Sequence, residues 1–498
     1  MKRLLTAEQM KRCDSYTIDT LGVPSRELMQ RAAAAAFREI MNGGFDLTKV
    51  LCISGTGNNG GDGLAAAMLL RHSGVNVEFY VCGEKSKMTK ECEYRFYALQ
   101  TAGVTEQRML DFTGVTLIID AVNGIGLSGE VRSPAAEIID EINNSGIPVV
   151  SLDIPSGINS DTGAPMGNAV RADMTVAFSK LKPGHIFYPG RIHCGKTVVV
   201  EIGIGDEGVA EDTPVVQIPD EEDIRKMIPG RYPDSHKGDF GRLLIVAGSE
   251  GMCGAAYFSA LGAYRSGVGL VEVFTPKVNV PIIQTKIPEA IATGWGDGAV
   301  QLLRERMKYA DTVVIGPGLG KSMEAAQLVE EALDCTVPLL IDADGLNLIA
   351  ESDSLRQKLK ARTNPTVVTP HQGEMSRLRC VTVEEVYREP IRSAVEFANE
   401  YGVVCVQKSA TTVVAKDDLA LMNRTGCTGL SKGGSGDVLT GVIGALLAAG
   451  VNDHDAAITG VYLHGIAGEI ASAEKTEYSL LATDIADSVG YAIKKILG

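Results

Sequence analysis

The chain has 498 residues, of which 45% are hydrophobic and 22% are charged, and its formal net charge is −15 at pH 7. This length exceeds the roughly 250–300 residues that one hydrophobic core supports, so we expect at least two domains. The negative charge, without a cluster of basic residues in the sequence, excludes nucleic acid as a favoured partner, because an acidic surface repels phosphate backbones.

The N-terminus and the cysteines indicate a cytoplasmic protein. Lys2 and Arg3 are not followed by the apolar stretch of a secretory signal. The longest apolar stretch, VLTGVIGALLAAGV, is too short to span about 30 Å of hydrocarbon, so we expect no membrane partner. The ten cysteines are scattered without a C-x-x-C motif, which is typical of reduced, buried thiols.

The first half of the chain alternates between helical and strand patterns. Thr6 and Gln9 form a capping-box pattern, which predicts an opening helix, and a second helix follows from about Ser25 to the glycines at 43 and 44. The helical stretches GLAAAMLLRHSG and TKECEYRFYALQTAG come later. Apolar strand patterns lie around them: KVLCIS, VNVEFYV, VTLIID, IPVVSLD, DMTVAF and KTVVVEIG. Strands separated by helices predict a parallel sheet covered on both faces.

The alternation stops and then restarts. Residues 206–235 are rich in Asp, Glu and Pro, and we expect a connector there, with the linker itself at 216–230. Further strand patterns follow: GRLLIVAG, GLVEVFTP, DTVVIGPG, VPLLIDADG, PTVVTPHQG and VVCVQKSATTVVAK. Three helices are predicted to close the chain, at 437–450, 454–473 and 480–497. The sequence therefore predicts two α/β domains, at 1–215 and 231–498.

Polar side chains follow three of the predicted N-terminal strands. The loop GTGNNGGDG contains Asp62, and Asp120 and Asp153 stand at the ends of two later strands. Ligands of open parallel sheets bind beyond the carboxyl ends of the strands, so we expect these loops to form one crevice. A tight glycine turn whose Asn and Asp cap a helix would explain the first loop alone. It does not explain all three loops together.

The polar residues of this crevice suit two kinds of chemistry. Asn59, Asp120 and Ser156 are hard oxygen ligands for a cation. Asp153 is a candidate acid/base.

The motif SKGGSGDVLTG combines a site for an anion with a carboxylate. Gly433, Gly434 and Gly436 allow backbone N–H groups to converge at a helix N-terminus, where a transferring phosphoryl group could bind, and we expect a side chain at Gly434 to fill the phosphate's place. Asp437 at the edge of this site could accept the proton of an attacking hydroxyl. The alternative is that Asp437 only interacts favourably with the helix dipole.

The motifs NNGGDG and DIPSG form a specific pair, and residues 1–215 resemble the NAD(P)H-hydrate epimerases, which have a Rossmann-like domain. The resemblance implies that Asp153 is catalytic and that potassium binds to Asn59, Asp120 and Ser156. It also implies the residues that bind the hydrated nucleotide: Asn58, Asn59, Gly60, Gly61, Asp62, Gly124, Ile125, Gly126, Leu127, Ser128, Gly129, Glu130 and Asp153.

Six motifs in the second half occur in the order found in a second family: HKGDFG, GPGLG, DADGLN, TPHQGE, QKSATT and SKGGSGDVLTG. They resemble the NAD(P)H-hydrate dehydratases, which have a ribokinase-like three-layer α/β/α domain. The resemblance implies that ADP or ATP, with Mg²⁺, is held by Lys408, Ser409, Ala410, Thr411, Thr412, Gly433, Gly434, Ser435 and Gly436. It places the hydrated nicotinamide against Ala255, Gly318, His371 and Asp437. His371 could instead be an ordinary loop histidine.

Together the two resemblances imply an enzyme that repairs hydrated NADH and NADPH. Its C-terminal domain would phosphorylate the C6 hydroxyl of the S hydrate with ADP and release phosphate, leaving NAD(P)H and AMP, and its N-terminal domain would recycle the R epimer. We expect small-molecule substrates and a homo-oligomer. The choices between ADP and ATP, and between the two hydrates, stay open.

Two other functions are compatible with parts of the pattern. One is a vitamin or sugar kinase of the ribokinase superfamily with a non-catalytic, nucleotide-binding N-terminal module. The other is an N-terminal domain that serves only as a scaffold, because a fold can lose its chemistry and keep ligand binding. The presence of Asn59, Asp120, Asp153 and Ser156 together argues against a scaffold.

Overall fold

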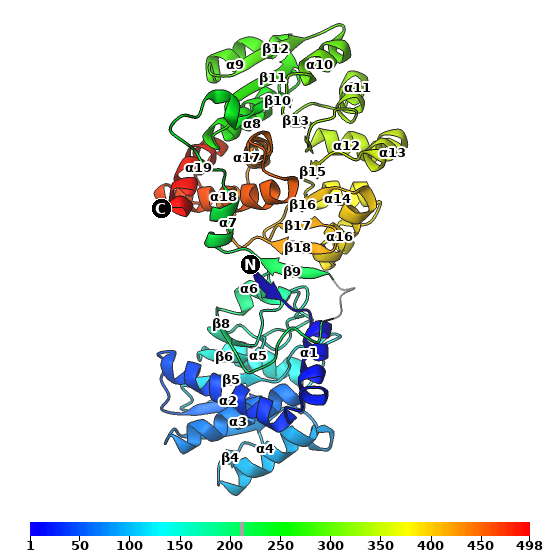
Figure 1. Ribbon diagram of the computed structural model, residues 1–498. Coiled ribbons are helices and arrows are strands. Elements are labelled where there is room, and N and C mark those ends of the chain that lie inside the picture. Colours follow the sequence, from blue (N-terminus) through cyan, green and yellow to red (C-terminus); the bar gives the residue numbers. More distant parts are fainter. Residues whose placement is uncertain (210–213) are drawn as a thin grey trace. The chain divides into compact units, whose positions relative to one another are not determined.

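The computed structural model describes residues 1–209 and 214–498. The chain forms two compact units, one of Arg3–Thr213 and one of Pro214–Gly498 together with Met1 and Lys2. Each unit contains a β-sheet with helices packed against it (Figure 1). The division into two α/β units agrees with the sequence pattern.

The segment expected to be a linker, 216–230, is not one. It contains most of β9 (Val215–Ile218) and all of α7 (Glu221–Met227), which belong to the C-terminal unit. Strand β9 pairs in parallel with β18, and Ile218 and Ile224 are buried. Its acidic residues do not mark a connector, since Asp220 caps α7 through its side chain and the others lie in the first helical turn, where negative charge is favourable.

The N-terminal sheet has seven strands in the order β4-β3-β2-β5-β6-β7-β8, and all described pairs are parallel. The chain proceeds from β2 to one side and later returns to the other, so a switch in strand order lies between β2 and β5. Ligands of such sheets bind at this point. The strands are β2 (Val50–Ser54), β3 (Val77–Val81), β4 (Thr105–Glu106), β5 (Leu117–Ala121), β6 (Val149–Leu152), β7 (Met174–Phe178) and β8 (Lys196–Val200).

Helices cover both faces of this sheet, which explains why its strands read as continuous apolar runs. In β2, Cys52 packs with residues of α1 to α4, whereas Leu51 and Ile53 pack with α5 on the other face. The predicted capping box of Thr6 and Gln9 is confirmed at the start of α1. The helices are α1 (Ala7–Asp19), α2 (Ser25–Asn42), α3 (Asn58–His72), α4 (Lys90–Thr101), α5 (Ala135–Ser145) and α6 (Gly190–His193), with short 3₁₀ turns at Lys85–Lys87 and Pro183–His185.

The C-terminal sheet has eleven strands in the order β1-β9-β18-β17-β16-β15-β14-β13-β10-β11-β12. The stretch VVCVQKSATTVVAK, read as one strand pattern, forms two antiparallel strands around a loop at 408–412. The strands are β1 (Lys2–Leu4), β9, β10 (Arg242–Val246), β11 (Leu270–Pro276), β12 (Ile291–Trp295), β13 (Thr312–Ile315), β14 (Leu339–Ile341), β15 (Thr366–Val368), β16 (Val404–Gln407), β17 (Val413–Lys416) and β18 (Leu419–Met422).

Two groups of helices pack against this sheet and make the unit three-layered. One group contains α8, α17, α18 and α19, which contact one another, and the other runs from α10 to α16 (Figure 1). The helices are α7, α8 (Cys253–Arg265), α9 (Val280–Lys286), α10 (Ala299–Met307), α11 (Met323–Ala332), α12 (Asp344–Glu351), α13 (Asp353–Ala361), α14 (Gln372–Arg379), α15 (Val383–Arg388), α16 (Pro390–Tyr401), α17 (Ser435–Ala448), α18 (Asp453–Glu474) and α19 (Ala482–Leu497).

The three predicted closing helices correspond to α17, α18 and α19. The apolar stretch in α17 packs in the core of the C-terminal unit. Within the described ranges, none of the helices has both the length and the apolar character that a membrane span requires.

Candidate functional sites

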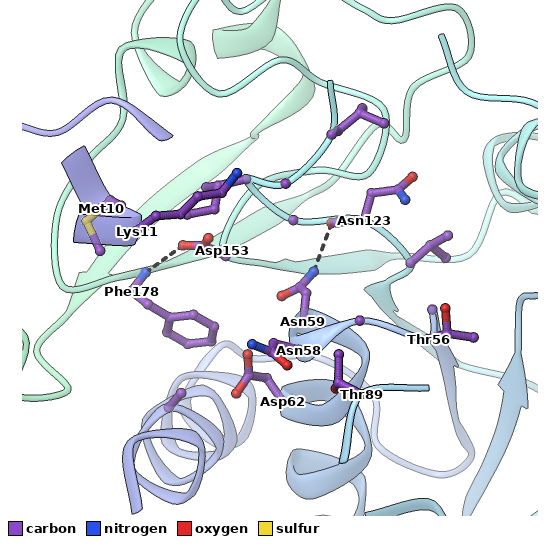
Figure 2. Close-up of a pocket in the computed structure, with 18 of the residues that line it drawn as sticks. Met10, Lys11, Thr56, Asn58, Asn59, Asp62, Thr89, Asn123, Asp153 and Phe178 are labelled. Atoms are coloured by element: carbon purple, nitrogen blue, oxygen red, sulfur yellow. Dashed lines mark hydrogen bonds between the residues drawn. The ribbon is translucent and has the colours of Figure 1, made fainter. Parts of the chain in front are cut away.

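The N-terminal unit contains a cavity of about 770 Å³ at the switch in strand order (Figure 2). It lies beyond the ends of β2, β5 and β6. Most of the residues predicted to bind the hydrated nucleotide line it: Asn58, Asn59, Asp62, Gly124, Ile125, Gly126, Leu127, Ser128, Gly129, Glu130 and Asp153. The predicted crevice therefore exists, and the three loops meet in it.

Gly60 and Gly61 do not line the cavity, because they support the loop from behind. A Cβ at Gly60 would lie 2.1 Å from the carbonyl oxygen of Gly55, and one at Gly61 would lie 2.6 Å from the terminal carbon of Met29. These glycines permit close packing between the loop and its surroundings. Helix α3 begins at Asn58 without a side-chain cap, which leaves backbone N–H groups at the cavity for a ligand.

The three predicted cation ligands form one buried polar cluster. Ser156 Oγ donates to Asp120 Oδ1 over 2.5 Å, and Ser151 Oγ donates to Asp120 Oδ2 over 2.7 Å. Burial raises the pKa of Asp120, although these hydrogen bonds oppose the change. Asn59 Nδ2 donates to the carbonyl oxygen of Asn123 over 2.8 Å. The side-chain oxygens of Asn59 and Asn123 are buried and accept no hydrogen bond within the described residues.

Asp153 is held in an unusual conformation next to a buried lysine. Its φ is +64°, in the left-handed region, which a non-glycine residue adopts only where its surroundings impose it. Lys182 Nζ, whose side chain is almost fully buried, lies 2.5 Å from Asp153 Oδ1. The backbone N–H of Phe178 donates to the same oxygen over 3.3 Å. Asp153 lines the cavity, and Figure 2 shows its hydrogen bond with Phe178.

Sequence analysis missed Lys182 and His185, which follow β7 at the edge of the same site. His185 Nδ1 accepts a hydrogen bond from the Lys182 backbone, so Nε2 carries the proton that is donated to the carbonyl oxygen of Asp153. Burial lowers the pKa of His185 to about 4. The neutral imidazole thus ties the Lys182 segment to the strained Asp153 backbone. The motif KPGH has no spacing that would predict this role.

The second site lies at the carboxyl ends of neighbouring strands in the C-terminal sheet. Lys408, which follows β16, is paired with Asp342, which follows β14, over 2.7 Å. Thr440 Oγ1 on α17 donates to the other oxygen of Asp342 over 2.6 Å. Burial opposes charge on both partners, but their attraction prevails, so the pKa of Asp342 is lowered and the pKa of Lys408 is raised. The pair is therefore ionised.

Asp437 lies in the first turn of α17, close to this ion pair. Burial and the carboxylates of Asp342 and Asp344 raise its pKa to about 6, while Lys408 opposes the shift. A carboxyl group with a pKa near the working pH can accept a proton and release it again. Asp342, like Lys182 and His185, had no role assigned from the sequence, although it lies in the quoted motif DADGLN.

The three glycines of the phosphate loop have different surroundings. A Cβ at Gly433 would meet nothing within 4 Å, and one at Gly436 would come no closer than 3.5 Å to Lys408 Nζ. At Gly434, φ is +92° and a Cβ would lie 2.8 Å from the ring of Phe258. The expectation that a side chain at Gly434 would fill the phosphate's place is therefore wrong, because that direction is occupied by protein. Gly436 is the glycine of this loop that lies beside the lysine ammonium.

We expect Gly436→Ala to weaken ADP binding without harming the fold. Alanine is favoured over glycine in a helix, so stability should not fall, but the added methyl group stands next to Lys408 Nζ, where a phosphate would bind. The dissociation constant measured by calorimetry should rise on the order of tenfold, which corresponds to about 1.4 kcal/mol. The matched control is Gly490→Ala, an open position in α19. Equal ADP affinity in both variants would contradict this placement of the phosphate.

Besides Asp437, the residues predicted to contact the nicotinamide lie in two places, one with Gly318 and Ala255 and the other with His371. Gly318 and Ala255 are in contact, since a Cβ at Gly318 would lie 2.8 Å from that of Ala255. His371 follows β15 and caps α14, with Nδ1 accepting from the N–H groups of Gly373 and Glu374. Burial and the nearby Lys408 lower its pKa, so its ring is neutral.

Two further groups at this site were not assigned a role from the sequence, although Glu374 lies in the quoted motif TPHQGE. Burial raises the pKa of Glu374 to about 7, although Lys408 opposes the shift. His464 Nε2 lies 3.3 Å from the hydroxyl of Ser435 in the predicted phosphate loop, and burial lowers the pKa of His464 to about 4.

The rest of the predicted nucleotide-binding residues lie in the loop between β16 and β17, where Ser409 Oγ donates to the carbonyl oxygen of Thr411 and Ala410 lies between them. The backbone N–H of Asn423 donates to the carbonyl oxygen of Thr412.

Two family models match the chain. One, described as NAD(P)H-hydrate dehydratase, matches residues 243–490, and the other, described as YjeF-related protein N-terminus, matches residues 25–184. A bifunctional NAD(P)H-hydrate repair enzyme of Coxiella burnetii is 35% identical over 97% of this chain and 98% of its own length. The enzyme of that name in Escherichia coli is 35% identical over 96% of this chain and 92% of its own length.

Solved structures resemble the C-terminal part of the chain. An ADP/ATP-dependent NAD(P)H-hydrate dehydratase from Bacillus subtilis, co-crystallised with ATP and Mg²⁺, has a TM-score of 0.50 and 33% identity, and the match covers 58% of this chain and all of that one. A ribokinase-like superfamily protein from Enterococcus faecalis has a TM-score of 0.50 and 28% identity, and the match covers 56% of this chain and 96% of that one. These matches agree with the three-layer α/β/α architecture of the C-terminal unit.

Proposed function

The chain belongs to the bifunctional NAD(P)H-hydrate repair enzymes, and we propose from this premise how its two units divide the work. The N-terminal unit, predicted as 1–215 and formed by Arg3–Thr213, interconverts the R and S epimers of the hydrate at C6. The C-terminal unit, predicted from 231 and beginning at Pro214, dehydrates the S epimer. ADP is the phosphoryl donor, and the products are NADH or NADPH, AMP and phosphate.

One observation supports this division above all. Each unit has its own candidate carboxylate near the carboxyl ends of parallel strands, and each carboxylate has a lysine near it, almost fully buried in the first unit and half-buried in the second. In the N-terminal unit Asp153 is paired with Lys182, and in the C-terminal unit Asp437 is influenced by Lys408. Two acid/base groups in separate compact units suit two reactions rather than one shared reaction.

In the N-terminal unit we assign the acid/base step at C6 to Asp153. Lys182 and the backbone N–H of Phe178 orient this carboxylate through their contacts with its Oδ1. The loops at 58–62 and 124–130 form the walls that hold the nucleotide. Helix α3, which starts in the first loop, presents free N–H groups to the phosphates.

Potassium fits the polar cluster beside this cavity. The buried Asn59 side-chain oxygen lacks a donor within the described residues, and it lies in the same cluster as the Asp120 carboxylate and the Ser156 hydroxyl. Neutral oxygens with a single carboxylate form a donor set for a hard cation of low charge. A potassium ion there would hold the two loops together and add positive charge beside the nucleotide. Asn59, Asp120 and Ser156 would be its side-chain ligands.

In the C-terminal unit Asp437 accepts the proton of the C6 hydroxyl as this oxygen attacks the terminal phosphorus of ADP. The loop at 433–436 and the N-terminus of α17 hold the transferring group, and Lys408 neutralises its charge. Phosphate is a better leaving group than hydroxide, so the C6–O bond breaks with phosphate leaving, and loss of a proton from C5 forms the C5=C6 double bond of the dihydropyridine ring. Nucleotide hydrolysis thereby drives a dehydration that the hydrate undergoes poorly by itself.

Mg²⁺ fits this site as a companion of the nucleotide rather than as a resident ion. Within the part of the chain that the structure describes, no three His, Cys, Asp or Glu side chains converge as a metal site. Mg²⁺ commonly binds through substrate phosphates, waters and one or two carboxylates, and would here shield the phosphate charge. Asp342, Asp344 and Glu374 are carboxylates near Asp437 and Lys408 that could take this part.

The proposed function is tested with a racemic hydrate. The full-length chain, ADP, Mg²⁺ and potassium are incubated with mixed R and S hydrate, and the absorbance of the reduced nicotinamide is followed. Both epimers should be converted completely to NAD(P)H. A kinase with a non-catalytic N-terminal module would instead accumulate a phosphorylated product and regain no reduced nicotinamide. Consumption of the S epimer alone would contradict the epimerase assignment.

The rate of dehydration should depend on the ionisation of Asp437. Its pKa of about 6 means that the active carboxylate form is populated above pH 6 and is lost as the pH falls through 6. With pure S hydrate and saturating Mg²⁺-ADP, kcat should be level between pH 7 and 8 and fall about tenfold per unit well below pH 6. A rate that stays level down to pH 5 would contradict Asp437 as the base.

The cysteines support a reducing compartment. All ten are free thiols, and all except Cys380 and Cys427 are buried. Scattered free thiols of this kind are typical of cytoplasmic proteins. We therefore place the enzyme in the cytoplasm, where its substrates are the hydrated nucleotide and ADP.

A further inference from the structure

A second carboxyl group, in the loop that forms one wall of the nucleotide site, faces the N-terminal cavity. Asp62 lies in the second turn of α3 and lines the cavity opposite the strand ends (Figure 2). Within residues 1–209 and 214–498 it makes no hydrogen bond or ion pair, whereas Asp153 binds both Lys182 and the backbone of Phe178. An unpartnered acid in a pocket is costly, so its position calls for a function.

The surroundings of the two carboxyl groups differ in charge. Asp62 is desolvated and faces Asp153 and Asp14, and these influences raise its pKa well above the ordinary value, while Arg95 opposes the shift. Asp153 has an ammonium group 2.5 Å away. One pocket therefore contains a carboxyl group whose protonated form is favoured by its surroundings and a carboxyl group paired with an ammonium, and such differing environments are typical of acid/base pairs.

A ring carbon that is held in one orientation can be inverted when a reacting group lies on each of its faces. Asp62 projects from α3, and Asp153 projects from the end of β6 on the facing side (Figure 2). The cavity between them, about 770 Å³ in all, has room for a hydrated nicotinamide ring. Resting on the epimerase function proposed above, we propose that Asp62 is the second catalytic residue of the epimerase and acts on the face of C6 opposite to Asp153.

In the proposed reaction, water leaves C6 from one face and another water adds from the opposite face. Asp62 donates its proton to the C6 hydroxyl, the C6–O bond breaks, and its electron pair leaves with a water molecule while the N1 lone pair forms a C6=N1 double bond. A water molecule then attacks C6 from the other face, the electron pair of the double bond returns to N1, and Asp153 accepts the proton of that water. One water leaves and one enters. Return of the proton from Asp153 to Asp62 restores the enzyme.

The test follows epimerisation alone, with full-length protein, pure S hydrate and no ADP, so that the dehydratase site is silent. Asp62→Asn should lower kcat for appearance of the R epimer by roughly 100- to 10,000-fold, with KM within about threefold of wild type. Asp62→Glu should recover part of this loss because it restores a carboxylic acid. The matched control is Asp140→Asn, an exposed acid on α5, which should behave as wild type. Thermal melting would show that the variants are folded.

Solvent oxygen provides a second readout that a merely structural role would not affect. In ¹⁸O-water, each inversion by wild type should introduce one solvent oxygen at C6, after subtraction of the uncatalysed exchange. Inverted product without ¹⁸O would overturn the step, and an Asp62→Asn rate within threefold of wild type would overturn the role of Asp62. If Asp153→Asn is inactive while Asp62→Asn is active, only this inference fails. If both are active, the epimerase assignment to Asp153 fails as well.

Discussion

Asp437→Asn is expected to abolish dehydration while leaving ADP affinity nearly unchanged. The amide cannot accept the hydroxyl proton, and loss of a positioned base typically costs roughly 100- to 10,000-fold in rate. The shape of the side chain is preserved, and Lys408 keeps its contact with Asp342. The nucleotide site formed by Lys408 and Gly436 should therefore stay intact. The measurement is kcat with pure S hydrate, together with the calorimetric dissociation constant for ADP.

The same substitution should also stabilise the free protein. Asp437 has a raised pKa, so its ionised form is disfavoured in the folded state by burial and by the carboxylates of Asp342 and Asp344. A shift from 3.8 to about 6 corresponds to about 3 kcal/mol at most. This destabilisation of wild type is absent below pH 3.8, grows between pH 3.8 and 6, and is complete above pH 6. The asparagine variant should therefore melt at a higher temperature at pH 8, and the difference should disappear toward pH 4.

A matched control for this variant is Asp297→Asn, an exposed acid that follows β12. It removes the same charge from the same unit without touching the site, and it should change neither kcat nor the pH dependence of stability. Dehydration by Asp437→Asn within about threefold of wild type would remove Asp437 from the mechanism. A large loss of ADP affinity would show instead that the residue serves mainly to bind the nucleotide.

Replacing Asp153 is expected to separate the two activities of the chain. Without the acid/base group at C6, the S epimer should still be dehydrated by the C-terminal unit, but the R epimer should disappear only at the uncatalysed rate. With a racemic hydrate and excess ADP, the progress curve should break near the S fraction and continue as a slow tail. Wild type should run to completion with a faster second phase.

The structure determines which substitution is suitable at this position. Asp153 has a φ of +64°, and asparagine tolerates this conformation better than alanine does. Asparagine also keeps an oxygen for Lys182, whereas alanine would leave the buried ammonium with the carbonyl oxygen of Phe178 but without a charged partner, and breaking a buried ion pair in this way typically costs about 3–5 kcal/mol. Asp153→Asn therefore tests the catalytic role alone, whereas Asp153→Ala would lower both the catalytic rate and the stability of the fold.

Potassium provides an internal control for the Asp153 experiment. If the cluster around Asn59 holds the cation, replacing potassium by lithium should slow the second phase in wild type, and the first phase must be followed separately for any effect on the dehydratase. Conversion of both epimers by Asp153→Asn at wild-type rates would contradict catalysis through this residue and would favour a scaffold role for the N-terminal unit.

Local sequence determined the elements of this protein and the positions of most candidate site residues. Apolar runs of strand length between helical patterns predict parallel sheets, because a strand buried on both faces has no polar side to alternate with. The ends of these strands are where ligands bind, so glycines and carboxylates at those positions could be recognised from order alone. Asn59, Asp120, Asp153 and Asp437 were identified in this way, and the resemblance to known families then supplied the substrate.

Tertiary structure decided what depends on contacts between residues distant in the chain. Lys182 and His185 reach Asp153 only because β7 lies beside β6, and no local pattern records that pairing. The acidic segment at 216–230 became a strand and a helix because β18, two hundred residues later, offered an edge for β9. Gly434 faces Phe258 rather than a phosphate, which follows from the packing of α17 against α8. The difference between Asp62 and Asp153 likewise arises from burial and neighbouring charge, which exist only after the chain has folded.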